Sequence, residues 1–254
     1  MKLEHKTILI TGGTSGIGLE LAKQLRQRGN TVIVTGRDHE KLEAASQKVP
    51  GIFIYRSDVA DENDIRTLYE QVTAKFPDLD VLINNAGVMR NLNLQQPRDL
   101  HDVTREIEIN LNGPIRLVQQ FLPHLKSRKN ALIVNVSSGL AFVPFPISPI
   151  YSAAKAGLHA YTQCLRVQLR NTGVSVVELA PPAVETPLLH AEFAEEMKGQ
   201  KGMDVTKLAQ KAIVGIEAGK LEIRPGLSNV LKVMSRVAPN VILNQMAKAS
   251  KPKT

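Results

Sequence analysis

Short runs of β-branched and aliphatic residues alternate with longer amphipathic patterns from the first residues of this chain to about residue 180. This alternation is typical of βαβ units, in which helices join the parallel strands of one sheet. It predicts an α/β fold with a doubly wound, mostly parallel sheet and helices on both faces. The expected strands are Thr7–Thr11, Thr31–Thr35, Ile52–Tyr55, Val81–Ile83, Ala131–Val136 and Ser175–Ala180, with a seventh at Leu221–Arg224.

No internal repeat and no Pro- or Gly-rich linker divides the chain, so residues 1–254 are expected to form a single domain. The least regular stretch follows the sixth strand, at the edge where α/β sheets bind ligands. Residues 187–203 are therefore expected to cover the substrate. Helices with one buried stripe are expected at Ile65, Leu68, Tyr69, Val72 and Phe76, and at Val118, Phe121, Leu122 and Leu125.

The formal net charge of +8 does not point to a nucleic-acid partner. Basic and acidic residues are interspersed along amphipathic segments, and no zinc-finger or RNA-binding motif interrupts them. No apolar stretch approaches the roughly 20 residues that span a bilayer, and there is no secretory leader, so a cytoplasmic protein is expected. Cys164, the single cysteine, lies in an apolar helical stretch and is expected to be a buried structural thiol.

A glycine-rich turn follows the first strand and precedes a helical pattern. Its glycines are spaced Gly-x3-Gly-x-Gly, and no Gly-Lys-Ser/Thr follows, which argues against a P-loop. Strand, glycine turn and helix in this order present helix N-terminal amides to a pyrophosphate, as in Rossmann-type sheets. The expected dinucleotide-binding residues of the turn are Gly12, Thr14, Ser15, Gly16, Ile17 and Gly18.

The residues after the second strand favour NADP(H) over NAD(H). Thr35, Gly36 and Arg37 lack the acidic side chain that would bind the ribose hydroxyls of NAD(H) and repel a 2′-phosphate. Arg37 is instead placed to bind that phosphate through charge-assisted hydrogen bonds. Asp38 follows directly and would weaken the preference, so NADP(H) is the expected cofactor and NAD(H) the alternative.

Tyr151 and Lys155 lie four residues apart and share one face of an expected helix. A free tyrosine has a pKa of about 10, so a neighbouring cation that lowered this pKa would suit the phenol to acid/base catalysis. Ser138 lies at the carboxyl end of the fifth strand, thirteen residues before Tyr151. Strand alternation points the hydroxyls of Ser137 and Ser138 in opposite directions, so only one of the two can face Tyr151.

These motifs and several others, in the same order over residues 7–186, resemble those of the short-chain dehydrogenase/reductase family. Residues 179–184 are similar to a bacterial DltE-like branch of that family. Pro182 stands where the family has a glycine, so a role that needs that amide does not carry over. The resemblance implies further cofactor contacts at Asp58, Val59, Asn85, Ala86, Gly87, Pro181, Val184 and Thr186, with Tyr151 and Lys155 also beside the cofactor.

The resemblance also implies an oxidoreductase that transfers a hydride between NADP(H) and a carbonyl or alcohol. In such an enzyme Ser138 polarises the carbonyl, Tyr151 is the general acid and base, and Asn110 positions a water for the proton relay. Lys155 tunes the phenol and binds the nicotinamide ribose. No metal is expected.

Two other classes of protein are possible on this pattern. A non-catalytic sensor or scaffold that binds NADP(H) would not need all of Asn110, Ser138, Tyr151 and Lys155. A sugar-nucleotide epimerase or dehydratase is disfavoured, because the 68 residues after Thr186 leave little room for a substrate domain. The substrate is not identified, but an apolar body is indicated by the expected pocket residues Leu140, Phe142, Val143, Phe145, Pro182, Leu188, Leu189 and Phe193.

An amphipathic pattern also occupies residues 227–247, where one helix kinked at Pro239 is expected. Three partners for its apolar stripe are considered, in order of preference: the protein's own core, a second subunit, and an anionic membrane surface. The family resemblance implies a homodimer or homotetramer. The stripe comprises Leu227, Val230, Leu231, Met234, Val237, Val241, Ile242 and Met246, accompanied by the basic residues Lys232, Arg236, Lys248, Lys251 and Lys253.

Overall fold

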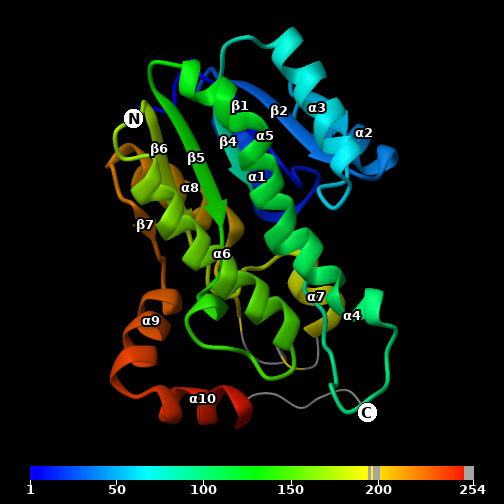
Figure 1. The fold of residues 1–254 in the computed structure, drawn as a ribbon, viewed down its shortest axis with the longest axis vertical. Helices are drawn as coiled ribbons and strands as arrows, with labels where there is room; N and C mark the ends of the chain where they lie inside the picture. The colour runs from blue at the N-terminus through cyan, green and yellow to red at the C-terminus, as the bar shows by residue number, and fades with distance from the viewer. Residues whose placement is uncertain (194–195, 197–200, 249–254) are drawn as a thin grey trace.

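The computed structural model describes residues 1–193, 196 and 201–248, and these contain one seven-stranded sheet. The strand order is β3-β2-β1-β4-β5-β6-β7, and every neighbouring pair is parallel. The chain therefore folds as the expected doubly wound sheet (Figure 1). The strands are β1 (Thr7–Ile10), β2 (Thr31–Gly36), β3 (Phe53–Arg56), β4 (Leu79–Asn84), β5 (Ala131–Val136), β6 (Val174–Leu179) and β7 (Glu222–Ile223).

The strand order reverses between β1 and β4, which places a topological switch point at the middle of the sheet. Ligands of doubly wound folds bind outside the carboxyl ends of the strands at such a point. The carboxyl ends face the end of the molecule where α4, α7, α9 and α10 lie (Figure 1). The bounds of these four helices are α4 (Leu100–Ile107), α7 (Pro187–Phe193), α9 (Leu227–Val237) and α10 (Pro239–Lys248).

Helices cover both faces of the sheet and form two hydrophobic cores. Both cores are built on β4 and β5, whose residues are buried along their whole length, as expected for central parallel strands. On one face lie α1 (Gly16–Gln27), α2 (His39–Lys48) and α8 (Val205–Glu217), and on the other α3 (Glu62–Lys75), α5 (Gly113–Ser127) and α6 (Pro149–Gln168).

Local sequence explains where several helices begin. The Asp61 carboxylate accepts hydrogen bonds from the amides of Asn63 and Asp64 at 2.7 and 3.0 Å and so caps α3. Asp38 caps α2 by accepting from the amide of Lys41 at 3.1 Å. The side chain of Asp38 is therefore engaged in starting a helix.

Two expectations are wrong, one about Cys164 and one about the C-terminal segment. Cys164 is exposed, because Leu158, Thr162 and Leu165 occupy the buried face of α6 and turn the cysteine outward. The C-terminal segment is a pair of helices and not one kinked helix, with the break at Ala238. A residue before proline is sterically disfavoured in the helical region, and Ala238 has φ −145° and ψ 63°.

Among the described residues, no helix is both long and apolar enough to cross a bilayer. The expected substrate cover at residues 187–203 begins as α7, whereas residues 194–195 and 197–200 lie outside the described part of the chain.

Candidate active site

The glycine turn between β1 and α1 is too closely packed for larger residues. Gly12 and Gly16 have φ of 64° and 53°, a region that favours glycine. A Cβ on Gly12 would lie 2.7 Å from the Cα of Ala86, and one on Gly18 would overlap the carbonyl of Gly12. The first amides of α1 have no intrahelical partner, so the turn and helix form a cradle suited to a pyrophosphate.

The loop after β4 supports this cradle. The side-chain amide of Asn85 donates to the carbonyls of Thr11 and Gly12 at 2.9 and 3.0 Å. The Thr11 hydroxyl in turn accepts from the backbone amides of Asn85 and Ala86. Asn85 thus holds the shape of the turn, and Thr11 is a supporting residue that the sequence motif alone did not single out.

The loop after β6 closes the other side of the cradle. A Cβ on Gly16 would lie 3.3 Å from the Cγ2 of Thr186, so the two loops are in close contact. The Thr186 hydroxyl donates to the carbonyl of Val184 at 3.2 Å, and the Pro181 carbonyl accepts from the amide of Gly139 at 2.8 Å. The expected cofactor residues of this loop therefore lie at the mouth of the glycine turn.

A pocket of about 360 Å³ lies beyond the carboxyl end of β2. Its lining includes Arg37 and Asp58, which were expected at the adenosine end of the cofactor, together with Arg105 and Arg116. Val59 is buried beside it, and a Cβ on Gly113 would lie 2.7 Å from the Val59 carbonyl. The pocket thus carries three guanidinium groups, two of which the sequence motifs did not indicate.

Tyr151 lies in the first turn of α6, where Pro149 begins the helix. The side chain of Ser138 lies close enough to the phenol of Tyr151 to act on its pKa, and both residues are buried. The Ser138 hydroxyl also accepts from the amide of Leu140 at 3.1 Å. Ser137 makes a different contact, because its hydroxyl donates to Glu178 at 2.5 Å, so Ser138 and not Ser137 is beside Tyr151.

Lys155 lies one turn after Tyr151 and is buried. Its ammonium donates to the Val136 carbonyl at 2.8 Å and lies 5.6 Å from the centre of the Tyr151 ring. Burial raises the pKa of Tyr151 to about 12 and lowers that of Lys155 to about 8. The expectation that a cation lowers the tyrosine pKa is therefore wrong for the free protein, because burial raises this pKa and Lys155 is not among the groups that shift it.

Asn110 lies in a π-helical turn (Glu108–Asn112) between α4 and α5. Its side chain accepts from the amide of Val88 at 3.2 Å and donates to the carbonyl of Val88 at 2.8 Å. A Cβ on Gly87 would lie 2.7 Å from the Asn110 Oδ1 and 3.7 Å from the Lys155 Nζ. Gly87 therefore lets the Asn110 and Lys155 side chains approach the same point.

Glu106, which the sequence analysis did not identify, is a buried carboxylate near the site. It accepts from the Arg90 amide at 3.0 Å, and its second oxygen lies 3.5 Å from the Arg90 guanidinium. Burial raises the pKa of Glu106, and its charge contributes to raising that of Tyr151. The sequence feature that could have identified Glu106 is its position four residues before Asn110, on the same helical face.

Burial of Lys155 predicts a pH-dependent stability in the cofactor-free protein. The pKa of Lys155 is about 8 when folded and 10.5 in the absence of burial, so between these values the unfolded chain binds more protons. The free energy of unfolding should therefore rise from about pH 8 to about pH 9.5, by about 1 to 2 kcal/mol. Above about pH 10 Tyr151 acts with the opposite sign, because its pKa is raised.

Denaturant unfolding of the wild type and of Lys155→Met across this pH range measures the effect. Lys155→Met has no ammonium to titrate and should not show the rise. An equal rise in both proteins would contradict the assignment to Lys155.

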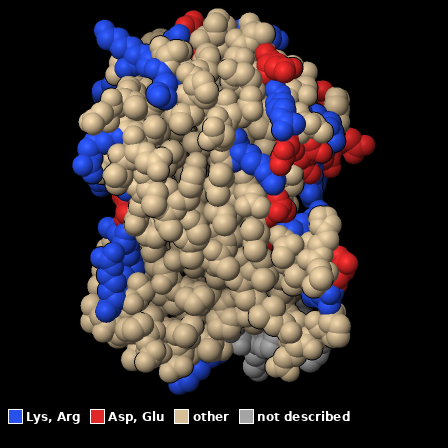
Figure 2. Space-filling view, in the orientation of Figure 1, with Lys and Arg blue, Asp and Glu red and all other residues tan. Residues whose placement is uncertain are grey.

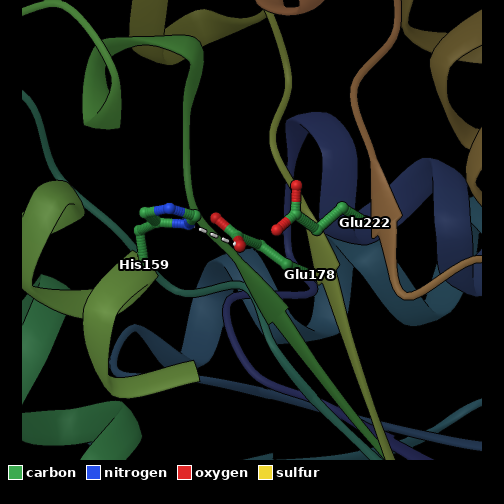
Figure 3. A group of neighbouring side chains, drawn as sticks. All are labelled: His159, Glu178 and Glu222. Atoms are coloured by element: carbon green, nitrogen blue, oxygen red, sulfur yellow. Dashed lines mark hydrogen bonds and ion pairs between the residues drawn. The ribbon is translucent and has the colours of Figure 1, made fainter. Parts of the chain in front are cut away.

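A separate polar cluster lies between β6, β7 and α6 (Figure 3). The Glu178 carboxylate, bonded to Ser137, is also 2.7 Å from the Nδ1 of His159. Glu222 is close to both but is held by the ammonium of Lys232 at 2.5 Å and by Arg224 at 3.0 Å. Because Lys232 occupies the cation position of this cluster, we do not assign a metal to it.

Several expected pocket residues have other roles. Phe142 packs edge-on against His159 with ring centres 5.0 Å apart, and Lys232 lies over its other side at 5.1 Å. Val143 and Phe193 are buried and belong to the packing beneath α7 and α6. Leu188 is exposed, and Leu140, Phe145, Pro182 and Leu189 are half-buried.

Comparison with known proteins identifies the family and the fold. A family model described as short chain dehydrogenase matches residues 6–197. The chain is 39% identical over 247 residues to the uncharacterized oxidoreductase DltE of Bacillus subtilis, covering 97% of this chain and 98% of that protein. It is 33% identical over 192 residues to the 3-oxoacyl-[acyl-carrier-protein] reductase FabG of Thermotoga maritima, covering 74% of this chain and 78% of that protein.

Solved structures share the fold. A short chain dehydrogenase from Burkholderia cenocepacia in complex with NADP superposes with a TM-score of 0.84 at 23% identity, covering 97% of this chain and 99% of that chain. A 3-ketoacyl-(acyl-carrier-protein) reductase from Brucella melitensis complexed with NADH gives a TM-score of 0.80 at 27% identity, covering 89% of this chain and 100% of that chain.

Proposed function

Because this chain belongs to the short-chain dehydrogenase/reductase family of nicotinamide-dependent oxidoreductases, we propose that it transfers a hydride between NADP(H) and a carbonyl or alcohol. The observation that carries the proposal is the burial of Tyr151 beside the Ser138 side chain, with the buried Lys155 one turn away. A non-catalytic NADP(H) sensor would have no use for this arrangement. Oxidation of NADPH with a panel of carbonyl compounds tests the proposal, and no turnover with any member would favour the sensor.

The residues around the site could hold the cofactor, and each has its own proposed role in the reaction. The glycine cradle, Asn85 and Thr186 would hold the dinucleotide, and NADP(H) supplies or accepts the hydride when bound. Ser138 hydrogen-bonds the substrate oxygen as charge develops on it. Tyr151 donates the proton in reduction and accepts it in oxidation, and Asn110 holds a water from which the proton is replaced.

The preference for NADP(H) rests on the guanidinium groups in the pocket beyond β2. Arg116 is already paired with Glu62 and Glu108 at 3.4 and 2.9 Å. Arg37 and Arg105 form no ion pair with any residue that the structure describes. Two unpaired cations in one pocket favour a ligand with a phosphate there, and Asp38 is engaged by capping α2.

Replacing Arg37 with alanine should raise the Kd for NADPH by about ten- to 150-fold, the value of one charge-assisted contact. The Kd for NADH should stay within about twofold, because NADH has no 2′-phosphate to lose a contact. Isothermal titration calorimetry measures both constants. The control is Arg170→Ala, which removes an exposed arginine far from the pocket. Equal weakening of NADH and NADPH would contradict the assignment.

The substrate that this site favours has an apolar body. The half-buried Leu140, Phe145 and Leu189 lie around the catalytic end, and the named activity of the FabG relative is that of a 3-oxoacyl reductase. We therefore propose 3-oxoacyl and other apolar carbonyl compounds as the first members of the panel. A single 254-residue domain, a cytoplasmic location and a homodimer or homotetramer remain predictions, to be tested by limited proteolysis, fractionation and light scattering.

A further inference from the structure

Helix α9 has four apolar side chains on the outside, whereas its Leu231 and Met234 are half-buried. Ser228 and Lys232, one turn apart, are 0% and 9% exposed, so they form the inward face. The residues on the outward face are Leu227, Val230, Val233 and Val237, which are 68%, 50%, 52% and 75% exposed. This order is the reverse of an ordinary surface helix, which buries its apolar stripe.

Specific contacts hold the helix in this orientation. The Lys232 ammonium pairs with Glu222 on β7 and lies over the Phe142 ring. Ser228 packs so closely that a Cβ on Gly139 would lie 2.8 Å from its hydroxyl. Turning α9 to bury its valines would break an ion pair with little exposure to solvent, so the outward stripe belongs to the folded protein.

The stripe continues onto α10, which packs against α9. Val241 and Leu243 on α10 are exposed, whereas Ile242 is buried. Figure 2 shows this end of the molecule as a largely uncharged surface with scattered basic groups. Exposed apolar side chains gathered on two adjoining helices are typical of a site of interaction with another surface.

Charge decides which surface fits. The chain has no Asp or Glu after Glu222. Arg224 and Lys232 are paired with Glu222, whereas Arg236 on α9 and Lys248 on α10 are exposed, and Lys251 and Lys253 lie outside the described residues. Two copies meeting through this face would bring like charges together. An anionic lipid surface would accept both the apolar stripe and the surrounding cations.

We propose that the outward face of α9 and α10 docks the protein on an anionic lipid surface. Helix α9 contacts the 3-10 turn Gly139–Ala141, which directly follows Ser138. The docked protein would therefore present the catalytic end of the sheet to the bilayer, where apolar substrates are concentrated. Docking is a property of the free protein surface and does not depend on which carbonyl the enzyme reduces.

Co-sedimentation of the full-length protein with vesicles tests the proposal. The wild type should bind vesicles containing phosphatidylglycerol. Binding should weaken when salt is raised from about 0.1 M to about 0.5 M, because the Debye length shortens and the attraction between the basic side chains and the lipid headgroups is screened. The variant Val230→Asp/Val237→Asp should bind at least about tenfold more weakly, since it loses two aliphatic groups and gains negative charge. The control is Val214→Asp, which alters a valine on α8 that is 58% exposed and should leave vesicle binding unchanged.

Circular dichroism and thermal unfolding of each variant establish that it is folded. Failure of the folded wild type to bind phosphatidylglycerol vesicles would overturn the proposal, as would unchanged binding by the double variant. A third outcome would also make the proposal wrong: the wild type does not bind vesicles, and light scattering shows that the folded double variant has a smaller mass than the wild type. The face would then be a subunit interface.

Discussion

Replacing Tyr151 with phenylalanine is expected to lower kcat for carbonyl reduction by about 10² to 10⁴-fold, the usual contribution of general acid/base catalysis. The phenyl ring keeps the packing of Tyr151 in the first turn of α6, so only the hydroxyl beside Ser138 and its transferable proton are lost. The Kd for NADPH should therefore change by less than about twofold. Stopped-flow turnover and fluorescence titration of NADPH measure the two quantities.

Tyr161→Phe is the matched control, because Tyr161 lies on the same helix, ten residues further on, and packs in the core beneath the sheet. It should keep wild-type kcat. A kcat for Tyr151→Phe within about tenfold of the wild type would contradict the acid/base role, because that is below the range of such catalysis.

Replacing Lys155 with methionine should damage turnover and cofactor binding together. The ammonium contacts the Val136 carbonyl and approaches the Tyr151 ring, so its removal leaves both the phenol and the cofactor side of the site without a cation. We expect kcat to fall by about 10²-fold or more, and the Kd for NADPH to rise by about tenfold, as for loss of a charged hydrogen bond.

Lys211→Met removes an exposed lysine on α8 and serves as the control for the loss of one positive charge. The two signatures separate the proposed roles of these residues: Tyr151→Phe is expected to affect kcat alone, and Lys155→Met is expected to affect both constants. A Lys155→Met variant with unchanged NADPH affinity would show that the ammonium does not contact the cofactor.

The architecture and much of the candidate site could be predicted from local patterns. Strand and helix signals depend on residues close in the sequence, and the six strands from β1 to β6 lie within a few residues of their expected positions. The glycine turn and the Tyr151–Lys155 spacing are equally local, because each depends on one turn or one helical step. What these residues do catalytically is a matter for the experiments above.

Features that depend on burial and on distant neighbours could not be predicted in this way. The direction of the Tyr151 pKa reflects desolvation by the assembled core and the charge of Glu106, which is 45 positions away in the sequence. Arg105 on α4 joins Arg37, which follows β2, in one pocket only through the tertiary fold, because the two residues are far apart in the chain.

The sequence by itself thus determined the doubly wound sheet, the glycine cradle and the residue set around Tyr151, because periodicity and turn chemistry act over a few residues. Only the tertiary structure decided which side of α9 faces solvent. The apolar stripe of that helix predicted burial, but the Lys232 ion pair with Glu222 and the contact of Ser228 with Gly139 turn it outward. The contact of Ser228 with Gly139 joins residues 89 positions apart, and the ion pair joins α9 to the strand before it, so the pattern of the helix contains neither.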